Sequence, residues 1–257
     1  MAAVPAATYD GEDATSLGTR LGVPAVHLYA SVGSTMDVAH ALAAAGAPDG
    51  TVVLSDAQTG GRGRAGRRWA SEPGAGVWLT VVTRPRDLPA LEVLSLRVGL
   101  AVAGRAEPLA DDRVLLKWPN DLLVGRRKLA GILIETRWRD GHAEWAAVGV
   151  GMNVSSPVGV PDGVGLRPGT ARVDAVAAIV TGVVEACARR GALDAAELAA
   201  LGARDAVRGR RVVEPVAGRT SGVTPTGLLR IEADDGRVHL LRQASVTYAD
   251  HGPELPG

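Results

Sequence analysis

Apolar residues in the central part of the chain come in short runs that turns interrupt, a pattern typical of β-strands. The run TVVLSD at 51–56 is rich in β-branched residues, and GVWLTVVTR at 76–84 has the continuous apolar character of a buried strand. Between 114 and 138 the pattern predicts a strand, a turn, a second strand, a tight turn at Gly125 and a longer strand. A further strand is predicted at 144–154, running into a glycine-rich end.

Other segments repeat their apolar residues at helical spacing. Ser34 can cap a helix over 36–46, with Asp37 in the position of the capping-box acid and Gly46 at the helix end. The same spacing predicts helices over 91–109, where Pro108 marks the end, and over 173–191 and 193–205.

The pattern changes after Val207, where short alternating strands are separated by the turns SGVTPTG and DDG. These strands indicate a small β-barrel or β-sandwich behind a mixed α/β main domain. The first residues show no periodicity and are expected to be loose. We therefore divide the chain into a loose segment (1–25), a main domain (26–205) and a small β domain (206–257).

Composition narrows the class of protein. Lysine and arginine together number 28, as do aspartate and glutamate, so the whole molecule does not bind polyanions through its bulk charge. Cys187 stands alone, which excludes an internal disulfide. The start has no basic region followed by an apolar one, and the longest apolar stretch, 175–184, is too short to span a bilayer. We expect a cytoplasmic protein that does not bind a membrane.

The segment Gly61 to Trp69, GRGRAGRRW, is the most unusual part of the chain. It fits the pattern G-x-G-x-x-G, but a dinucleotide site needs a helix to begin there, and here a strand follows. Three interpretations stay open: a solvated basic loop, a single-strand nucleic-acid channel, and an anion-binding loop in which glycines fold the backbone over a ligand while guanidinium groups hold phosphate or carboxylate.

Lys117 ends an apolar run just before a proline-containing turn, where a side chain faces either a crevice or the solvent. Downstream, Gly131 and the run Gly149 to Asn153 put small residues in strands, which marks the close approach of a ligand or of another backbone. No nucleophile with its base can be assigned, and the histidines have no metal-ligand spacing. The implied chemistry is electrostatic stabilisation by fixed cations.

These motifs, in this order, resemble the bacterial biotin protein ligases. The resemblance depends on Ser34-Thr35, Gln58 with GRGRAGRRW, KWPNDLLV, KLAGILIE and GVGMNV, and it is dense over residues 28–154. It implies an α+β fold with a mixed sheet and flanking helices, like the catalytic domain of class II aminoacyl-tRNA synthetases, and a small C-terminal SH3-like β-barrel. It also implies that biotin and ATP, with Mg²⁺, form biotinyl-5′-AMP, and that biotin then passes to a lysine of a biotin carboxyl carrier domain of an acyl-CoA carboxylase.

The resemblance also implies roles for individual residues. Lys117 and Arg64 would be catalytic, with Lys117 between the biotin carboxylate and the α-phosphate. The biotin site would comprise Ser34, Thr35, Gln58, Gly61, Arg62, Arg64, Lys117 and Gly131. The nucleotide and adenylate site would comprise Arg62, Arg64, Arg67, Trp69, Lys117, Asn120 and Asn153. No protein metal site is expected.

Some members of that family carry an N-terminal helix-turn-helix domain, and the residues before Ser34 are too few and too unpatterned for one. We therefore expect no repressor activity and no nucleic acid as partner. The alternatives are a lipoate or octanoate ligase of the same fold and, from a different class, a nucleic-acid-binding module that uses the arginine-rich loop.

Overall fold

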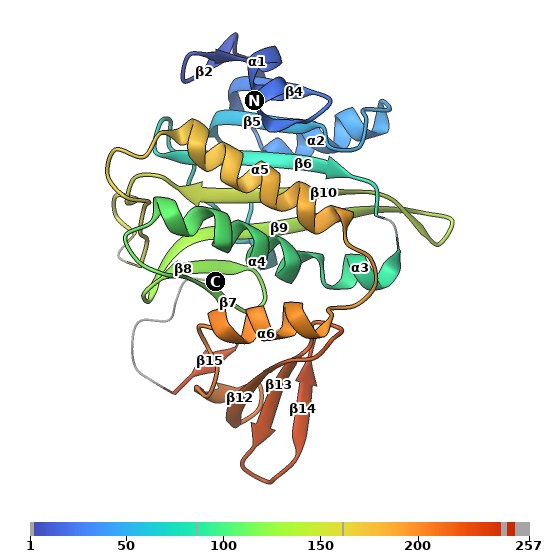
Figure 1. Cartoon of the computed structure of the whole chain (residues 1–257), viewed down its shortest axis with the longest axis vertical. Coiled ribbons are helices and arrows are strands. Elements are labelled where there is room, and N and C mark those ends of the chain that lie inside the picture. Colours follow the sequence, from blue (N-terminus) through green and yellow to red (C-terminus); the bar gives the residue numbers. More distant parts are fainter. Residues whose placement is uncertain (1–2, 86, 161, 243–245, 250–257) are drawn as a thin grey trace.

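A mixed eight-stranded sheet forms the centre of the molecule (Figure 1). The structure, a computed structural model, describes residues 3–85, 87–160, 162–242 and 246–249. The strand order is β1-β4-β5-β6-β10-β9-β8-β7, in which β4 and β5 are parallel and the other neighbours are antiparallel. Its strands are β1 (Val4–Pro5), β4 (Val26–Val32), β5 (Val52–Gln58), β6 (Gly76–Thr83), β7 (Val114–Lys117), β8 (Asp121–Val124), β9 (Arg127–Arg139) and β10 (His142–Asn153).

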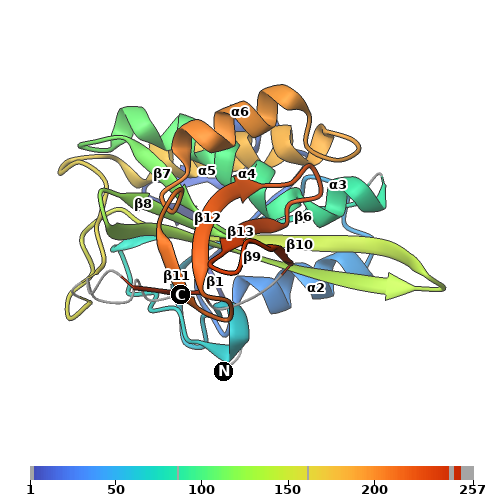
Figure 2. The same ribbon diagram turned by 90° about the horizontal axis from the view of Figure 1, so that it is seen from below.

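Helices cover both faces of this sheet. In Figure 2, α4 and α5 lie on one face and α2 lies on the other. Alternate residues of each strand point to opposite faces, so Val52 and Leu54 belong to the core under α4 and α5, whereas Val53 belongs to the smaller core under α2. The helices are α1 (Ala14–Leu21), α2 (Thr35–Ala44), α3 (Leu88–Glu92), α4 (Leu94–Ala106), α5 (Arg172–Ala188) and α6 (Ala195–Arg204), with short 3₁₀ turns η1 (Arg64–Gly66) and η2 (Glu107–Leu109).

The prediction of a mixed sheet with flanking helices is confirmed. Ser34 caps α2 as predicted, since its hydroxyl accepts a hydrogen bond from the backbone N–H of Met36. The capping-box role predicted for Asp37 is wrong, because its carboxylate instead binds the side chain of Arg62, far along the sequence.

The prediction of a loose segment over 1–25 is wrong for its described part. Asp13 caps α1 by accepting from the N–H of Ser16, and Gly22 ends this helix at a positive φ. Leu17 is completely buried, and Tyr9 is nearly so, with its hydroxyl donating to the carbonyl of Gly76. The segment is ordered because a few apolar side chains insert into the core, and no periodicity in so short a stretch indicates this. Residues 1–2 lie outside the described part.

The C-terminal strands form a separate five-stranded sheet, in the order β14-β13-β12-β11-β15. They are β11 (Arg211–Glu214), β12 (Gly218–Val223), β13 (Leu229–Ala233), β14 (Val238–Leu241) and β15 (Thr247–Tyr248), while β2 (Thr8–Tyr9) and β3 (Glu12–Asp13) form a small hairpin near the N-terminus. Part of the segment predicted as a turn, SGVTPTG, belongs to β12, because Val223 pairs with Leu229 of β13 and this pairing holds it extended. Among the described residues β14 does not pair with β15, so no closed barrel is observed.

Helix α6 lies between the central sheet and the C-terminal sheet (Figure 1). Within the described ranges, no helix is both long and apolar enough to cross a bilayer. The proposed domain boundaries at 25 and 205 stay predictions, and residues 243–245 and 250–257 of the predicted β domain lie outside the described part.

Candidate active site

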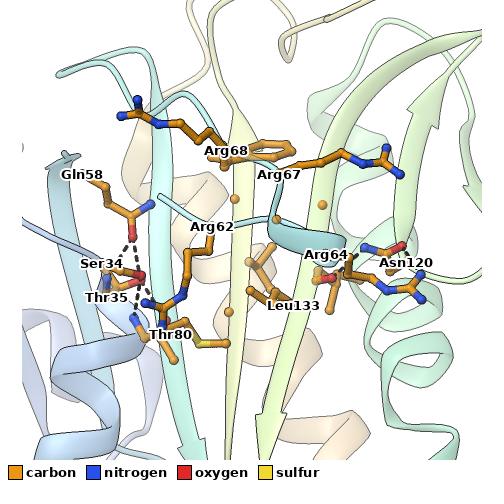
Figure 3. A pocket seen from close by; sticks show the side chains of 18 of the residues that line it. Ser34, Thr35, Gln58, Arg62, Arg64, Arg67, Arg68, Thr80, Asn120 and Leu133 are labelled. Atoms are coloured by element: carbon orange, nitrogen blue, oxygen red, sulfur yellow. Dashed lines mark hydrogen bonds between the residues drawn. The ribbon is translucent and has the colours of Figure 1, made fainter. Parts of the chain in front are cut away.

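A pocket lies on the face of the central sheet that carries α2. The middle of the sheet forms its floor, where Gly131, Gly149 and Gly151 have no side chains to fill the space. The arginine-rich loop 60–69 covers it (Figure 3). The lining also includes side chains from α2, from β6 and from the turn after β7. The lining residues are Ser34, Thr35, Met36, Gln58, Arg62, Gly63, Arg64, Arg67, Arg68, Trp69, Leu79, Thr80, Asn120, Lys128, Gly131, Ile132, Leu133, Gly149, Val150 and Gly151.

Trp69 anchors the end of the loop on a pair of glycines. Gly131 of β9 and Gly151 of β10 are directly opposite one another in the sheet. A Cβ atom on Gly151 would lie 2.6 Å from the indole Nε1 of Trp69, and one on Gly131 would lie 3.0 Å from its Cζ3. Close approach of the indole therefore accounts for both glycines, so the group that approaches them is a side chain of the loop, where the sequence pattern predicted a ligand or another backbone. Trp69 also packs edge-on against Trp78, with ring centroids 6.4 Å apart.

One end of the pocket is polar and uncharged. The Oε1 atom of Gln58 accepts hydrogen bonds from the backbone N–H of Thr35 at 2.9 Å and from its hydroxyl at 3.1 Å. The hydroxyls of Thr35 and Thr80 lie 2.8 Å apart, and the Nε2 of Gln58 donates to Ser71 at 2.9 Å. Ser34, Thr35 and Thr80 are all nearly fully buried. Such a cluster is arranged to exchange hydrogen bonds with a neutral polar group.

The two arginines predicted to face the ligand have different surroundings. Arg62 donates to Asp37 at 2.7 Å and lies 3.4 Å from the carboxylate of Glu135. Burial lowers the pKa of Arg62, but its hydrogen bond to Asp37 and the charge of Glu135 outweigh this effect and raise the pKa overall. Arg62 is thus already neutralised by protein carboxylates.

Arg64 lies at the opposite end of the pocket from Ser34 and Thr35, beside Asn120 (Figure 3). Its Nη1 atom donates to Oδ1 of Asn120 at 3.1 Å, and Nδ2 of Asn120 is held by the carbonyl of Ile132. Within the described part of the chain no carboxylate lies within ion-pair distance of Arg64. Burial lowers its pKa, the charge of Asp121 offsets part of this, and Arg67 lowers it further. Arg64 is therefore a half-buried guanidinium in the pocket that can receive an anion.

Lys128, at the start of β9, supplies a second cation to the same end of the pocket. Its Nζ lies 2.9 Å from Oδ1 of the buried Asp121 and 5.1 Å from the ring centroid of Trp69. Lys117 ends β7, directly opposite Asp121 of the neighbouring strand β8. Burial lowers the pKa of Lys117 to about 8, and the charges of Lys128, Arg210 and Arg67 add to this effect, while Asp121 opposes it.

Most of the predicted site residues come together in this pocket. Three of them do not line it: Gly61, Lys117 and Asn153. Gly61 is needed in the loop backbone, since a Cβ there would lie 2.5 Å from the carbonyl oxygen of Trp69. Asn153 donates from Nδ2 to the carbonyls of Lys128 and Val164, both at 3.2 Å, and so fixes the backbone that carries Lys128.

Two residues of the pocket that the site prediction lacks have recognisable positions in the sequence. Lys128 and Thr80 line the pocket but were not among the predicted residues. Thr80 is the polar residue in the middle of an otherwise apolar strand, VWLTVV. Lys128 and Lys117 are the two lysines of the chain, and the other 26 of its 28 basic residues are arginines. Two lysines beside one pocket, on the strands β7 and β9 that flank β8, indicate positions that require an ammonium group.

No group of three or more histidine, cysteine, aspartate or glutamate side chains among the described residues could hold a metal ion. Near the pocket, Asp37 and Glu135 bind Arg62, and Asp121 binds Lys128. The pocket therefore combines a neutral polar end, an apolar and glycine-lined middle, and a cationic end. These features define a small-molecule site for an elongated ligand with a polar head, an apolar stem and an anionic end.

Residues 28–153, just under half of the chain, match the model of the Biotin/lipoate A/B protein ligase family. The chain is 40% identical over 132 residues to the bifunctional ligase/repressor BirA of Bacillus subtilis, a match that covers 50% of this chain and 40% of that protein. It is 41% identical over 145 residues to the biotin–[acetyl-CoA-carboxylase] ligase of Mycobacterium tuberculosis, which covers 54% of this chain and 53% of that protein. The matches thus span about half of these relatives or less.

Solved structures show the same fold. The biotin protein ligase from Aquifex aeolicus in complex with biotin and ATP superposes with a TM-score of 0.72 at 23% identity, over 87% of this chain and 97% of that one. The biotin protein ligase from Leishmania major in complex with biotin gives a TM-score of 0.61 at 23% identity, over 86% and 99% of the two chains.

Proposed function

We propose that the chain is a biotin protein ligase. In the first step a carboxylate oxygen of biotin attacks the α-phosphorus of ATP, the bond to pyrophosphate breaks, and biotinyl-5′-AMP forms. In the second step the amine of a carrier lysine attacks the acyl carbon, an amide forms, the lysine loses a proton and AMP leaves. The carrier is a biotin carboxyl carrier domain of an acyl-CoA carboxylase.

The distribution of charge along the pocket is the observation that carries this proposal. Biotin has a ureido head that both donates and accepts hydrogen bonds, an apolar chain and a terminal carboxylate. The head fits the cluster of Thr35, Gln58 and Thr80. The carboxylate fits the end where Arg64 and Lys128 lie.

Individual roles follow from this orientation. Arg64 and Lys128 meet the carboxylate and the α-phosphate, and Lys117 acts from the nucleotide side, so the bridging role expected of Lys117 alone is shared with Lys128. Asn120 orients Arg64, and Asn153 acts indirectly by fixing the backbone of Lys128. The residues that bind the biotin head and chain are Ser34, Thr35, Gln58 and Gly131. The residues of the loop that covers the adenylate are Gly61, Arg62, Arg64, Arg67 and Trp69.

Catalysis of the first step is electrostatic. Carboxylate and phosphate repel one another, and fixed cations between them stabilise the transition state, in which their charges are close, more than the separated substrates. The loop excludes water, which protects the mixed anhydride from hydrolysis. No protein nucleophile is required.

Mg²⁺ enters this proposal with the substrate. Since Mg²⁺ is commonly bound through substrate phosphates and one or two carboxylates, the charge it supplies neutralises ATP phosphates and needs no dedicated protein cage. We further propose that the reaction is cytoplasmic and that the C-terminal sheet is an SH3-like domain. The repressor activity in the name of the Bacillus relative is not part of the proposal.

A lipoate or octanoate ligase is the alternative within the family. The polar end of the pocket argues against it, because an acyl chain there would cover buried hydroxyl and amide groups without offering them a further hydrogen bond. Competition between biotin and lipoate for binding separates these two activities.

The test is biotin-dependent exchange of pyrophosphate into ATP, followed by transfer of biotin to a purified carrier domain. We expect both activities in the wild-type chain and a strong loss of the exchange reaction in Lys128→Met. Glu144→Gln, a change on the exposed part of the β9–β10 hairpin, is the control and should keep full activity. Exchange that depends on lipoate, or on neither acid, would overturn the proposal.

A further inference from the structure

Arg62 ties the arginine-rich loop to two other elements of the fold. Its guanidinium spans from Asp37 on α2 to Glu135 on β9, and it lies on the Ser34–Thr35 side of the pocket (Figure 3). Both carboxylates are partly exposed, but the carboxylate of Glu135 also contacts His40. The loop therefore has one attachment through Asn120 at its Arg64 end and another through carboxylates at its Arg62 end.

The contacts behind Glu135 fix its carboxylate. Oε2 of Glu135 lies 3.2 Å from Nε2 of His40, and Nδ1 of His40 lies 2.9 Å from the indole Nε1 of Trp145. An indole N–H can only donate, so Nδ1 of His40 must accept. In the neutral ring the proton is then on Nε2, which donates to Glu135. Trp145 thus donates to His40, His40 donates to Glu135, and Arg62 donates to the same carboxylate from the other side, which links Trp145 to the loop.

The elements bring these residues together from distant parts of the sequence. Glu135 is opposite Ala147 in the β9–β10 ladder, and Trp145 lies two residues before Ala147, so both side chains are on the sheet face that carries α2. Trp145 also packs against the small core under α2, which limits its movement. The chain of hydrogen bonds therefore begins at a fixed point of the core and ends on the loop.

We propose that Glu135, oriented by His40 and Trp145, is a positioning residue that acts through Arg62 to hold the loop over the pocket. This inference deepens the proposed function, because the same loop is there proposed to retain the adenylate. In this arrangement Arg64 meets the ligand, whereas Arg62 serves as the tether. Neither His40 nor Trp145 lines the pocket, so their effect on the ligand is indirect.

Hydrogen exchange of the backbone amides of residues 61–68, measured on the full chain without ligand, tests the proposal. Glu135→Gln should raise exchange about two- to five-fold, the range expected when a partly exposed ion pair is lost. Trp145→Phe, which removes the N–H but keeps an aromatic ring, should raise exchange by a smaller factor. Glu144→Gln, which removes a carboxylate paired with Arg139 on the same hairpin, is the matched control and should change nothing in the loop.

A double-mutant cycle shows whether Glu135 acts through Arg62. In an Arg62→Gln background, Glu135→Gln should cause no further increase in exchange, and Glu135→Asp in the wild-type background should partly restore protection. An equal increase in both backgrounds, or no increase beyond that of Glu144→Gln, would overturn the proposal. In a second arm, Glu135→Gln should speed release of biotinyl-5′-AMP by the same factor. If the wild-type chain forms no adenylate, the proposed function fails, and the exchange result alone still decides the role of Glu135.

Discussion

Substituting Gly151 by alanine should displace the arginine-rich loop without touching any side chain of the loop. The added Cβ would lie 2.6 Å from Nε1 and 2.7 Å from Cε2 of Trp69, whereas non-bonded atoms of this kind prefer about 3.5–4.0 Å. The indole must therefore move by roughly 1 Å. If it cannot move, overpacking of this kind costs about 1–3 kcal/mol of folding stability. If it can, the cost appears as weaker ligand binding.

Two measurements show how much of the effect of Gly151→Ala is lost folding stability and how much is weaker ligand binding. Thermal unfolding reports the folding part, at about 2–4 °C per kcal/mol for a chain of 150–250 residues. Titration calorimetry with biotin, and then with biotin and ATP, reports the binding part. Gly104→Ala is the control, since this exposed glycine of α4 has no atom within 4 Å of the added Cβ and should be neutral or slightly stabilising. A Gly151→Ala chain with wild-type stability and wild-type ligand affinity would refute the account of the Trp69 contact.

Three further predictions concern the cationic groups of the site. Arg64→Gly removes a charged hydrogen-bonding group worth about 1.5–3 kcal/mol, so biotinyl-5′-AMP should dissociate about 10- to 100-fold faster and label bystander lysines; an unchanged off-rate, measured by filter binding, would contradict this. The pKa of Lys117 in the folded chain, about 8, is below its ordinary value of 10.5, so the ammonium form costs stability. The unfolding free energy of the wild type should therefore rise relative to that of Lys117→Met between pH 8 and 10.5, by up to about 3 kcal/mol. Urea titrations over this pH range measure the difference, and parallel pH profiles of the two chains would refute the prediction. Arg68→Lys places an amine at the pocket rim and should acquire biotin at residue 68 by mass spectrometry, whereas the exposed Arg230→Lys should not.

Local patterns predicted most of the secondary structure, because the central elements have clear periods and caps. Ser34 caps α2 where the sequence indicated. Asp37 shows where local reasoning fails: its position suits a capping box, but Arg62, 25 residues later, competes for the same carboxylate and binds it. A prediction that considers one helix at a time cannot detect such a competitor. The prediction for the start of the chain was wrong for a related reason, since α1 depends on the burial of Leu17 in the core.

Most of the residues taken from the motifs line the pocket, but Lys117 does not, and Lys128, which was not selected, does. Both Lys117 and Lys128 occur in recognisable motifs, and the prediction selected Lys117. Which of them reaches the pocket depends on the register between β8 and β9, where an irregularity at Leu122 and Leu123 shifts the pairing so that Lys128 is opposite Leu123. A bulge of this kind moves side chains relative to the facing strand and leaves no mark in the hydrophobic pattern.

The distribution of lysine follows from the chemistry we propose. An acyl-adenylate reacts with neutral amines, and a guanidinium remains protonated and unreactive at any physiological pH. The chain carries 26 arginines against two lysines, and both lysines lie beside the pocket. Lys128 is held by Asp121, whose Oδ1 lies 2.9 Å from its Nζ, so its amine is engaged within the protein. An enzyme built in this way offers its own intermediate almost no competing side-chain amine, so the lysine of the carrier domain becomes the favoured acceptor.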